Sequence, residues 1–297
     1  MTRRQPRVSI GLPVYNGERY LEECLDSILA QTFEDFELII ADNASTDRTE
    51  ELCRGYATRD KRITYYRNET NIGIFRNFNR VFQLSSGEYF KWASADDVCH
   101  PDLLAKCLEV LDRDQNVILA YPKTTFIGDN GKVLDLMDPG WNLTTDVAYA
   151  RIRYVMHSGH KVNAFFGLLR AKSLAKTRLF PTYIGGDYRL LGELSLLGKF
   201  LEILGRLFFR RIHAGASSQS SGQEWQSLFF FGKSRKISFP VCSRSRDHSL
   251  TVIRSDLCIA HKISLLSFIF YDFLAQKLMV PKQFRTAIKR LLKRDPF

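Results

Sequence analysis

The sequence predicts an α/β domain of three layers, in which a mainly parallel, mixed sheet lies between helices and further helices follow at the carboxyl end. Five short apolar segments, at residues 7–14, 36–41, 63–66, 89–92 and 117–121, alternate with stretches whose apolar residues recur at helical spacing. Such alternation is typical of parallel sheets with helices on both faces. With 297 residues, 45% of them hydrophobic, the chain can bury a substantial core.

Local signals place the helices after their strands. Asn16 is expected to cap the first helix, and Asp47 and Glu50 have capping-box spacing before the second. Residues 129–132 predict a hairpin turn, and residues 144–157 predict a helix. The apolar faces of the first and third helices comprise Tyr20, Leu21, Cys24, Leu25, Ile28 and Leu29, and Phe75, Phe78, Val81 and Phe82.

Two adjacent carboxylates, Asp96 and Asp97, follow the fourth predicted strand. They can face one ligand only if the strand has already ended, and Pro101 supports this because proline favours the start of a helix. Ligands of open α/β sheets bind at the carboxyl ends of the strands, and paired oxygen donors there suit Mg²⁺ or Mn²⁺ carrying a phosphate. The alternative is a solvated acidic turn that caps the next helix.

Polar residues follow each of the first three strands as well. Tyr15, Asp42 and Asn71 all occupy strand-to-helix connections, so they are expected along the same edge of the sheet as Asp96 and Asp97. The chain lacks both G-x-G-x-x-G and G-x-x-x-x-G-K-[ST]. A nucleotide bound at this edge would therefore depend on a metal rather than on a glycine-rich loop to hold its phosphates.

Several motifs in order carry a resemblance to a known family. Residues 8–16 (VSIGLPVYN), 33–47 (FEDFELIIADNASTD), 71–73 (NIG) and 94–97 (SADD) with Pro101 resemble the family 2 glycosyltransferases, which have the GT-A fold and use nucleotide sugars. The resemblance covers the first 125 residues well and the next 90 loosely. It implies a nucleotide-sugar half at 1–125, an acceptor half at 126–218 and a helical, basic extension at 219–297.

The resemblance also implies roles for matching residues. Pro13, Tyr15 and Asp42 would line the pocket for base and ribose, and Asp96 with Asp97 would form the metal and nucleotide motif.

Two departures from the family pattern change these assignments. Asn43 stands where relatives often have a second acid, although its amide can still hydrogen-bond a base edge. Ser94 breaks the frequent D-x-D pattern, so metal ligation falls chiefly to Asp97 and a ribose or metal role to Asp96. The expected donor is a nucleoside diphosphate sugar, with UDP as the expected nucleotide.

Asp187 and His213 are the candidates in the second half. Asp187 begins a predicted helix and matches the family's general base, although it could instead cap that helix; Glu193, two turns later, should point elsewhere. His213 follows a predicted strand at 200–212, and the resemblance implies that it can complete the metal site. Imidazole would favour Mn²⁺ over Mg²⁺. A structural role for His213 remains the alternative, and His157 and His160 are expected in a surface loop.

Charge and cysteines suggest a compartment and a surface. Lysine and arginine number 43 against 32 acids, which favours anionic partners. Residues 282–294 predict a basic amphipathic helix that either binds an anionic membrane or packs on the domain, whereas 263–280 is too polar for a membrane span. The six cysteines show no C-x-x-C pair and no signal sequence precedes the first strand, so a cytoplasmic location is expected, at or near the membrane face.

These features together predict a metal-dependent, inverting glycosyltransferase that acts on a hydroxyl of a saccharide or glycolipid, in polysaccharide or cell-surface glycan synthesis. A sugar-phosphate nucleotidyltransferase is one alternative, since it would also place paired carboxylates and Mg²⁺ on an α/β sheet. A non-catalytic basic protein that binds membrane or nucleic acid is another. The sequence does not interleave aromatic with basic residues along a strand as nucleic-acid binding would need, so no nucleic-acid partner is expected.

Overall fold

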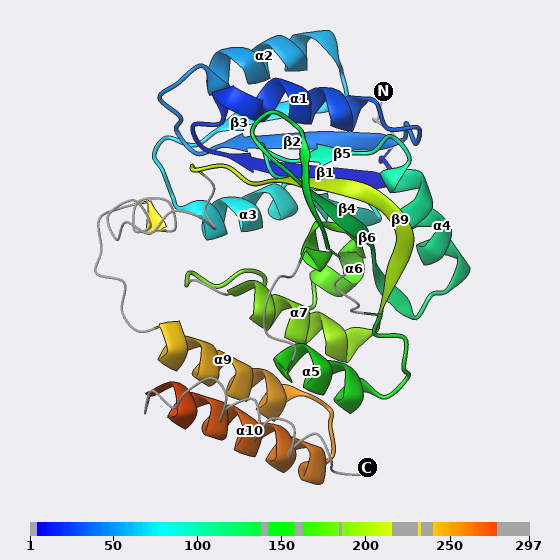
Figure 1. Ribbon diagram of the computed structural model, residues 1–297, viewed down its shortest axis with the longest axis vertical. Helices are drawn as coiled ribbons and strands as arrows, with labels where there is room; N and C mark the ends of the chain where they lie inside the picture. The colour runs from blue at the N-terminus through cyan, green and yellow to red at the C-terminus, as the bar shows by residue number, and fades with distance from the viewer. Residues whose placement is uncertain are drawn as a thin grey trace.

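The computed structural model describes residues 5–137, 142–157, 163–183, 186–215, 231–232 and 240–277. Its strands form one sheet in the order β3-β2-β1-β4-β8-β6-β9-β5, with β7 paired to β6 (Figure 1). The strands are β1 (Val8–Val14), β2 (Phe36–Asp42), β3 (Ile63–Arg67), β4 (Tyr89–Trp92), β5 (Val98–Cys99), β6 (Val117–Ile127), β7 (Val133–Met137), β8 (Leu168–Arg170) and β9 (Lys199–Arg211). The helices are α1 (Glu18–Leu29), α2 (Thr49–Arg59), α3 (Ile74–Gln83), α4 (Leu103–Arg113), α5 (Ala148–His157), η1 (Ala164–Phe166), α6 (Ala171–Leu174), α7 (Gly186–Leu197), α9 (Pro240–Arg254) and α10 (Ile259–Lys277).

The first four predicted strands are confirmed, and they pair in parallel. β1 lies between β2 and β4, and β2 also pairs with β3. Helices α1 and α2 cover one side of these strands and α3 the other (Figure 1). Both faces are therefore buried, and β1 is buried along its whole length, which explains why its sequence shows no polar alternation.

The sequence did not indicate β8, which separates the two halves of the sheet. It pairs antiparallel with both β4 and β6, so β6 runs in the same direction as β4 without touching it. β9 is parallel to β6. As a result β9 ends at the same edge of the sheet as β1 to β4, and its carboxyl end can reach the loops that follow them.

The predicted helix caps are wrong in detail. Gly17 rather than Asn16 is the N-cap of α1, and Asn16 adopts a left-handed conformation with φ of 51°. α2 has no side-chain cap: Glu50 forms an ion pair with Arg67, while Asp47 accepts a hydrogen bond from the backbone of Glu18 in α1. Asp47 also accepts from the N–H of Thr49, the first residue of α2, at 3.0 Å, so it bonds to its own helix as well as to α1.

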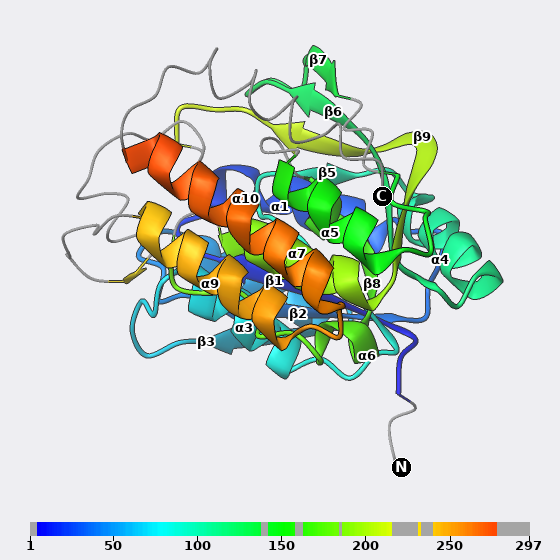
Figure 2. The same cartoon turned by 90° about the horizontal axis from the view of Figure 1, so that it is seen from below.

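The second half follows the predicted outline. The hairpin turn at 129–132 connects β6 to antiparallel β7, and Gly131 has φ of 74°. α5 begins at Ala148, later than the predicted 144. α9 and α10 form a helical hairpin against α5 and α7, with a small apolar core of its own (Figure 2). No helix in the described ranges is long and apolar enough to cross a bilayer, and residues 282–294 lie outside those ranges.

The two loop histidines differ in what can be said of them. His157 closes α5 instead, with Nδ1 2.7 Å from the carbonyl of Arg153 and its ring stacked on Phe268. His160 lies outside the described residues.

Candidate active site

The loops after β1 and β2 are fixed to each other by hydrogen bonds. The backbone N–H of Asn16 donates to the Ser45 hydroxyl at 2.9 Å, and the Asn16 side-chain oxygen accepts from the N–H of Thr46 at 2.8 Å. The left-handed backbone of Asn16 allows this reciprocal pair, because asparagine tolerates that conformation better than most residues. Half-buried Tyr15 therefore stands on a rigid loop, next to buried Pro13 of β1.

Asp42 is fully buried at the end of β2, and both of its oxygens are engaged. One accepts from the N–H of Ser45 at 2.9 Å. The other accepts from the Tyr65 hydroxyl at 2.7 Å and from Arg67 at 3.2 Å, both on β3. The carboxylate thus connects the ends of two strands, and its own side chain is not exposed to the edge of the sheet.

Asn43 belongs to a buried network of amides beside Asp42. Its oxygen accepts from Asn68 at 3.0 Å and from the N–H of Ile72 at 2.9 Å, and its nitrogen donates to Asn71 at 2.6 Å. Asn71 also accepts from the N–H of Gly73. The Asn71 amide nitrogen is buried and has no hydrogen-bond partner among the described residues. Asn43 therefore holds the loop after β3 in place, and the Asn71 side chain keeps an N–H group that has no hydrogen-bond partner within the described residues.

Asp96 meets His213 at the end of β4. One Asp96 oxygen lies 3.1 Å from His213 Nε2, and the other accepts from the Ser94 hydroxyl at 2.5 Å. Burial acts to raise the pKa of Asp96, but these hydrogen bonds and the His213 charge outweigh it and hold the pKa below the usual value. The Asp96 side chain remains 29% exposed, so the carboxylate is both ionised and accessible.

Asp97 is placed differently from its neighbour. It is 5% exposed, and one of its oxygens accepts from the backbone N–H of Arg211 at 2.9 Å. Burial and the adjacent Asp96 charge raise its pKa well above the ordinary value. Asp97 therefore holds the loop after β4 against the end of β9.

Arg211 attaches two further elements to this loop. Its guanidinium is buried and donates to the carbonyls of Asp96 and Gly128 at 3.0 Å and 2.9 Å, and it pairs with Glu23 of α1. It also lies over the ring of Tyr20, whose ring contacts His213 with centroids 4.8 Å apart. The position of His213 beside Asp96 is thus set from β9, α1 and the β6–β7 turn.

Asp187 begins α7, as predicted, and is half-buried. Burial raises its pKa above the ordinary value, and the charges of Arg210 and Arg244 and the Tyr188 N–H oppose the rise. Arg210 also acts on the pKa of Asp97. The Arg210 charge therefore acts on one carboxyl at the start of α7 and on one in the loop after β4. Glu193 points elsewhere, as predicted, and pairs with Arg178.

Three residues at or near the site could not be identified from sequence reasoning. Arg210 and Arg211 look like surface charges of a strand, and the hydrogen bonds of Arg211 reach Asp96 and Asp97, more than 100 positions away. Gly232, in the stretch assigned to a basic extension, packs against the loop after β3: a Cβ there would lie 2.0 Å from the Asn71 carbonyl oxygen. Its φ of 70° is left-handed, a conformation that favours glycine, but a single glycine in the sequence does not reveal that conformation.

The donor set fits a hard or borderline divalent cation. Two ligands at right angles, each about 2.1 Å from a metal, lie about 3 Å apart, close to the observed separation of Asp96 oxygen and His213 nitrogen. Within the described ranges no group of three or more His, Cys, Asp and Glu side chains could enclose an ion. The remaining positions would be left for substrate oxygens and water, as is usual for Mg²⁺ bound with phosphates.

Comparison with solved structures identifies the fold. The chain superposes on TarS 1–349 of S. aureus in complex with UDP-GlcNAc with a TM-score of 0.68 at 19% identity, covering 93% of this chain and 74% of TarS. It superposes on the mannosyltransferase PcManGT of Pyrobaculum calidifontis, in complex with GDP-Man and Mn²⁺, with a TM-score of 0.53 at 17% identity, covering 97% and 85%. The fold is GT-A, as expected.

Curated relatives are glycosyltransferases. An uncharacterized one from Haemophilus influenzae is 25% identical over 90% of this chain and 81% of its own length. Another, from Methanocaldococcus jannaschii, is 34% identical over 46% of this chain, which spans 47% of that relative. Chondroitin synthase of Escherichia coli is 28% identical over 73% of this chain and 30% of its own length. The model of glycosyl transferase family 2 matches residues 9–172, more than half of the sequence. The chain therefore belongs to glycosyltransferase family 2.

Proposed function

We propose that this enzyme transfers a sugar from a nucleoside diphosphate to a hydroxyl of a saccharide or glycolipid, with inversion and with the help of Mn²⁺ or Mg²⁺. The observation that carries the proposal is the meeting of Asp96 and His213, 117 residues apart, at the sheet edge where both halves end their strands. The charge of Arg210 acts on the pKa of both Asp187 and Asp97, which supports a place for Asp187 in the same site. Neither the nucleotidyltransferase nor the non-catalytic alternative has an observation in its favour.

In the proposed site, the accessible and the buried carboxylates have different roles. Asp96 and His213 would hold the cation, whereas buried Asp97, the chief ligand expected from the sequence, would fix the loop through Arg211. A bound cation would supply a Lewis acid that neutralises charge on the departing diphosphate. Asp187 would accept the proton of the acceptor hydroxyl, since a raised pKa suits a general base near neutral pH.

In the donor pocket too, some residues would contact the ligand and others would only hold the pocket in shape. Tyr15 and the Asn71 amide nitrogen would contact the nucleotide, since Tyr15 is half-buried and the Asn71 nitrogen is an unused donor. Asp42 and Asn43 would shape the pocket from behind, because their polar atoms are already bonded to protein. UDP is the proposed nucleotide, supported by the UDP-GlcNAc bound to TarS; the Mn²⁺ of PcManGT supports manganese.

The product is proposed to be a polysaccharide or a cell-surface glycan. The similarity to chondroitin synthase supports a saccharide acceptor. A cytoplasmic location fits a nucleotide-sugar donor and five cysteines that the structure shows as free thiols, four of them buried. We also propose that the basic residues 282–294 hold the enzyme at the cytoplasmic face of an anionic membrane.

A melting-temperature screen of nucleotide sugars, with and without Mn²⁺, tests the proposal. We expect one donor to raise the melting temperature by roughly 5–10 °C at about 100 times its dissociation constant, and only with the metal. Asp96→Asn should abolish the metal-dependent part of the shift. Asp102→Asn is the matched control, because Asp102 also faces a histidine, His100, at 3.8 Å but lies away from the site.

Two results would contradict the proposal. One is an Asp96→Asn variant that keeps the full Mn²⁺-dependent shift. The other is the release of pyrophosphate, rather than nucleoside diphosphate, during turnover, which would indicate a nucleotidyltransferase.

A further inference from the structure

The outer face of α10 carries a row of exposed apolar side chains. Ile259, Ile263, Phe270 and Leu274 are 76%, 60%, 61% and 37% exposed. At 100° per residue their offsets of 4, 11 and 15 positions place all four within a sector of about 60°. Such a row is more than scattered surface hydrophobicity, because all its members point the same way. Figure 1 shows α10 on the side of α9 that is turned away from the sheet.

A groove continues this row towards α5. It has a volume of about 570 Å³, and Ala260, Ile263 and Ser267 of α10 form one of its walls. Tyr149 and Arg153 of α5 lie on the opposite wall. The full lining is Tyr149, Arg153, His157, Ala260, Ile263, Ser264, Leu265, Ser267, Phe268 and Tyr271. The row and the groove together form one mainly apolar surface, whose lining also includes aromatic rings and the guanidinium of Arg153.

The charge of this part of the chain is strongly positive. Residues 240–297 contain eleven lysines and arginines against four aspartates and no glutamate, an excess of seven positive charges out of eleven for the whole protein. Six of these cations follow Val280, beyond the end of α10 at Lys277. Within the described hairpin Arg246 is 73% exposed. Basic side chains therefore occur both before and after this apolar face in the sequence.

We propose that the α10 face, defined as Ile259, Ile263, Phe270 and Leu274, docks on an anionic phospholipid bilayer. Interfacial helices combine an apolar face with basic flanks, and their apolar side chains enter the boundary between headgroups and acyl chains. A second copy of this chain is a poorer occupant, because a stable interface uses about 20–30 residues on each side and the basic hairpins would repel each other. Docking on a bilayer, in contrast, requires only the four apolar side chains of the α10 face.

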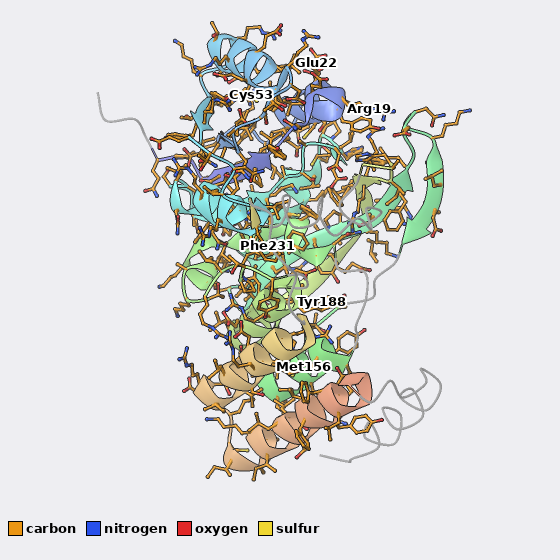
Figure 3. All side chains as sticks on the ribbon, turned by 90° about the vertical axis from the view of Figure 1, so that its left-hand side faces the viewer. Arg19, Glu22, Cys53, Met156, Tyr188 and Phe231 are labelled. Carbon is orange, nitrogen blue, oxygen red and sulfur yellow. The ribbon has the colours of Figure 1, made fainter. Side chains whose placement is uncertain are left out.

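The hairpin that would dock lies beside the start of α7, which carries Asp187, and not beside the Asp96–His213 pair, which contacts Tyr20 of α1. Arg244 of α9 acts on the pKa of Asp187 and pairs with Asp272 of α10 at 3.7 Å, so the same end of the hairpin adjoins the start of α7. Figure 3 shows α9 and α10 at the end of the molecule opposite Arg19 and Glu22 of α1, with Met156 of α5 beside them. Delivery of a lipid-linked acceptor from this side rests on the proposed transfer reaction, whereas docking of the α10 face does not.

Vesicle flotation with the full-length protein tests the docking. The wild type should float with phosphatidylcholine vesicles that contain phosphatidylglycerol, should bind pure phosphatidylcholine more weakly, and should lose affinity as salt is raised. Ile263→Gln with Phe270→Gln should weaken binding by roughly tenfold or more. Val133→Gln with Leu134→Gln is the matched control, because these β7 side chains are 61% and 59% exposed, and it should bind like the wild type.

Four outcomes bear on the proposal. Unchanged vesicle binding in the Ile263/Phe270 variant overturns it. A wild type that is dimeric in solution and does not float, with a variant that is monomeric, also overturns it and assigns the face to a second copy. Loss of flotation with an unchanged donor-dependent melting shift supports docking and shows that the variant is folded. A wild type that floats but gives no donor shift would leave docking supported and the proposed function contradicted.

Discussion

At the scale of single residues, Asp187 owes its proposed role to its surroundings. Burial raises the pKa of this carboxyl, and Arg210, Arg244 and the Tyr188 N–H only partly offset that effect. A base acts in its deprotonated form, so the rate should fall as the pH is lowered through the raised pKa. The acid limb of the kcat profile should therefore lie above the ordinary aspartate value of 3.8.

Asp187→Asn separates catalysis from folding. We expect kcat to fall by about 10²–10⁴-fold while the donor-dependent melting shift is kept. Because the folded pKa lies above the unfolded one, the ionised carboxylate lowers the free energy of unfolding as the pH rises above 3.8. The variant should accordingly be as stable as the wild type, or more stable, at pH 7. A large drop in melting temperature would mean that Asp187 is a structural cap of α7.

Single residues also show the limits of sequence reasoning. Asp96 and Asp42 could be assigned to one edge because each directly follows an apolar strand, and parallel strands end together. The burial of Asn43 could not be foreseen, since its partners Asn68 and Asn71 look like ordinary loop residues. The same holds for the difference between Asp96 and Asp97, which depends on a backbone N–H of Arg211, 114 residues away.

At the scale of elements, β8 depends on a close approach of backbone to backbone. Gly167 precedes β8, and a Cβ there would lie 2.4 Å from the carbonyl oxygen of Ala120 on β6. Gly192, within α7, has no neighbour within 4 Å of the corresponding position. A methyl group added at Gly167 would therefore collide with the backbone, whereas one added at Gly192 would have room.

The two alanine variants should change stability in opposite directions. Gly167→Ala is expected to lower the free energy of unfolding by roughly 1–3 kcal/mol, because backbone atoms must move apart. Gly192→Ala is expected to raise it by about 0.5–1 kcal/mol, because alanine favours helix. Urea titrations followed by circular dichroism measure both changes. Equal effects in the two variants would contradict this account of the β8 junction.

The elements most easily predicted were the long or strongly patterned ones. β2 was clear from its apolar run and α1 from its spacing, whereas three-residue β8 is too short to show any period. Asn16 failed as a cap because its side chain satisfies the next loop rather than its own helix. The pairing of β8 and the bond of Asn16 both depend on residues that are distant in the sequence. A local sequence pattern carries no information about such contacts.

At the scale of the whole molecule, charged contacts join the helical hairpin to the α/β domain. Arg178 donates to Glu193 of α7 at 2.6 Å and to Thr251 of α9 at 2.7 Å. Arg189 of α7 is 6% exposed and lies 3.6 Å from Asp247 of α9. This network connects the segment before α7, α7 itself and α9.

Glu193→Ala should loosen this connection. Removing Glu193 deprives Arg178 of this carboxylate and leaves buried Arg189 with Asp247 but without its second carboxylate, and we expect a loss of roughly 2–4 kcal/mol in the free energy of unfolding. Glu51→Ala is the control, since Glu51 pairs with Arg48 in full contact with water and its loss should leave the urea midpoint unchanged. Similar midpoints for the two variants would show that the network adds no stability.

The insertion of β8 between the halves has a consequence during synthesis. One edge of β4 stays open until residues 168–170 leave the ribosome, and at about 5–20 residues per second that takes several seconds. An open apolar strand invites pairing with another nascent chain. Lys91, in the middle of β4, ends up 1% exposed, with its ammonium bonded to the carbonyls of Trp92 and Phe166. Until η1 brings Phe166 into place, that charge makes β4 a poor template for aggregation, and afterwards the ammonium donates hydrogen bonds to the backbone carbonyls that surround it.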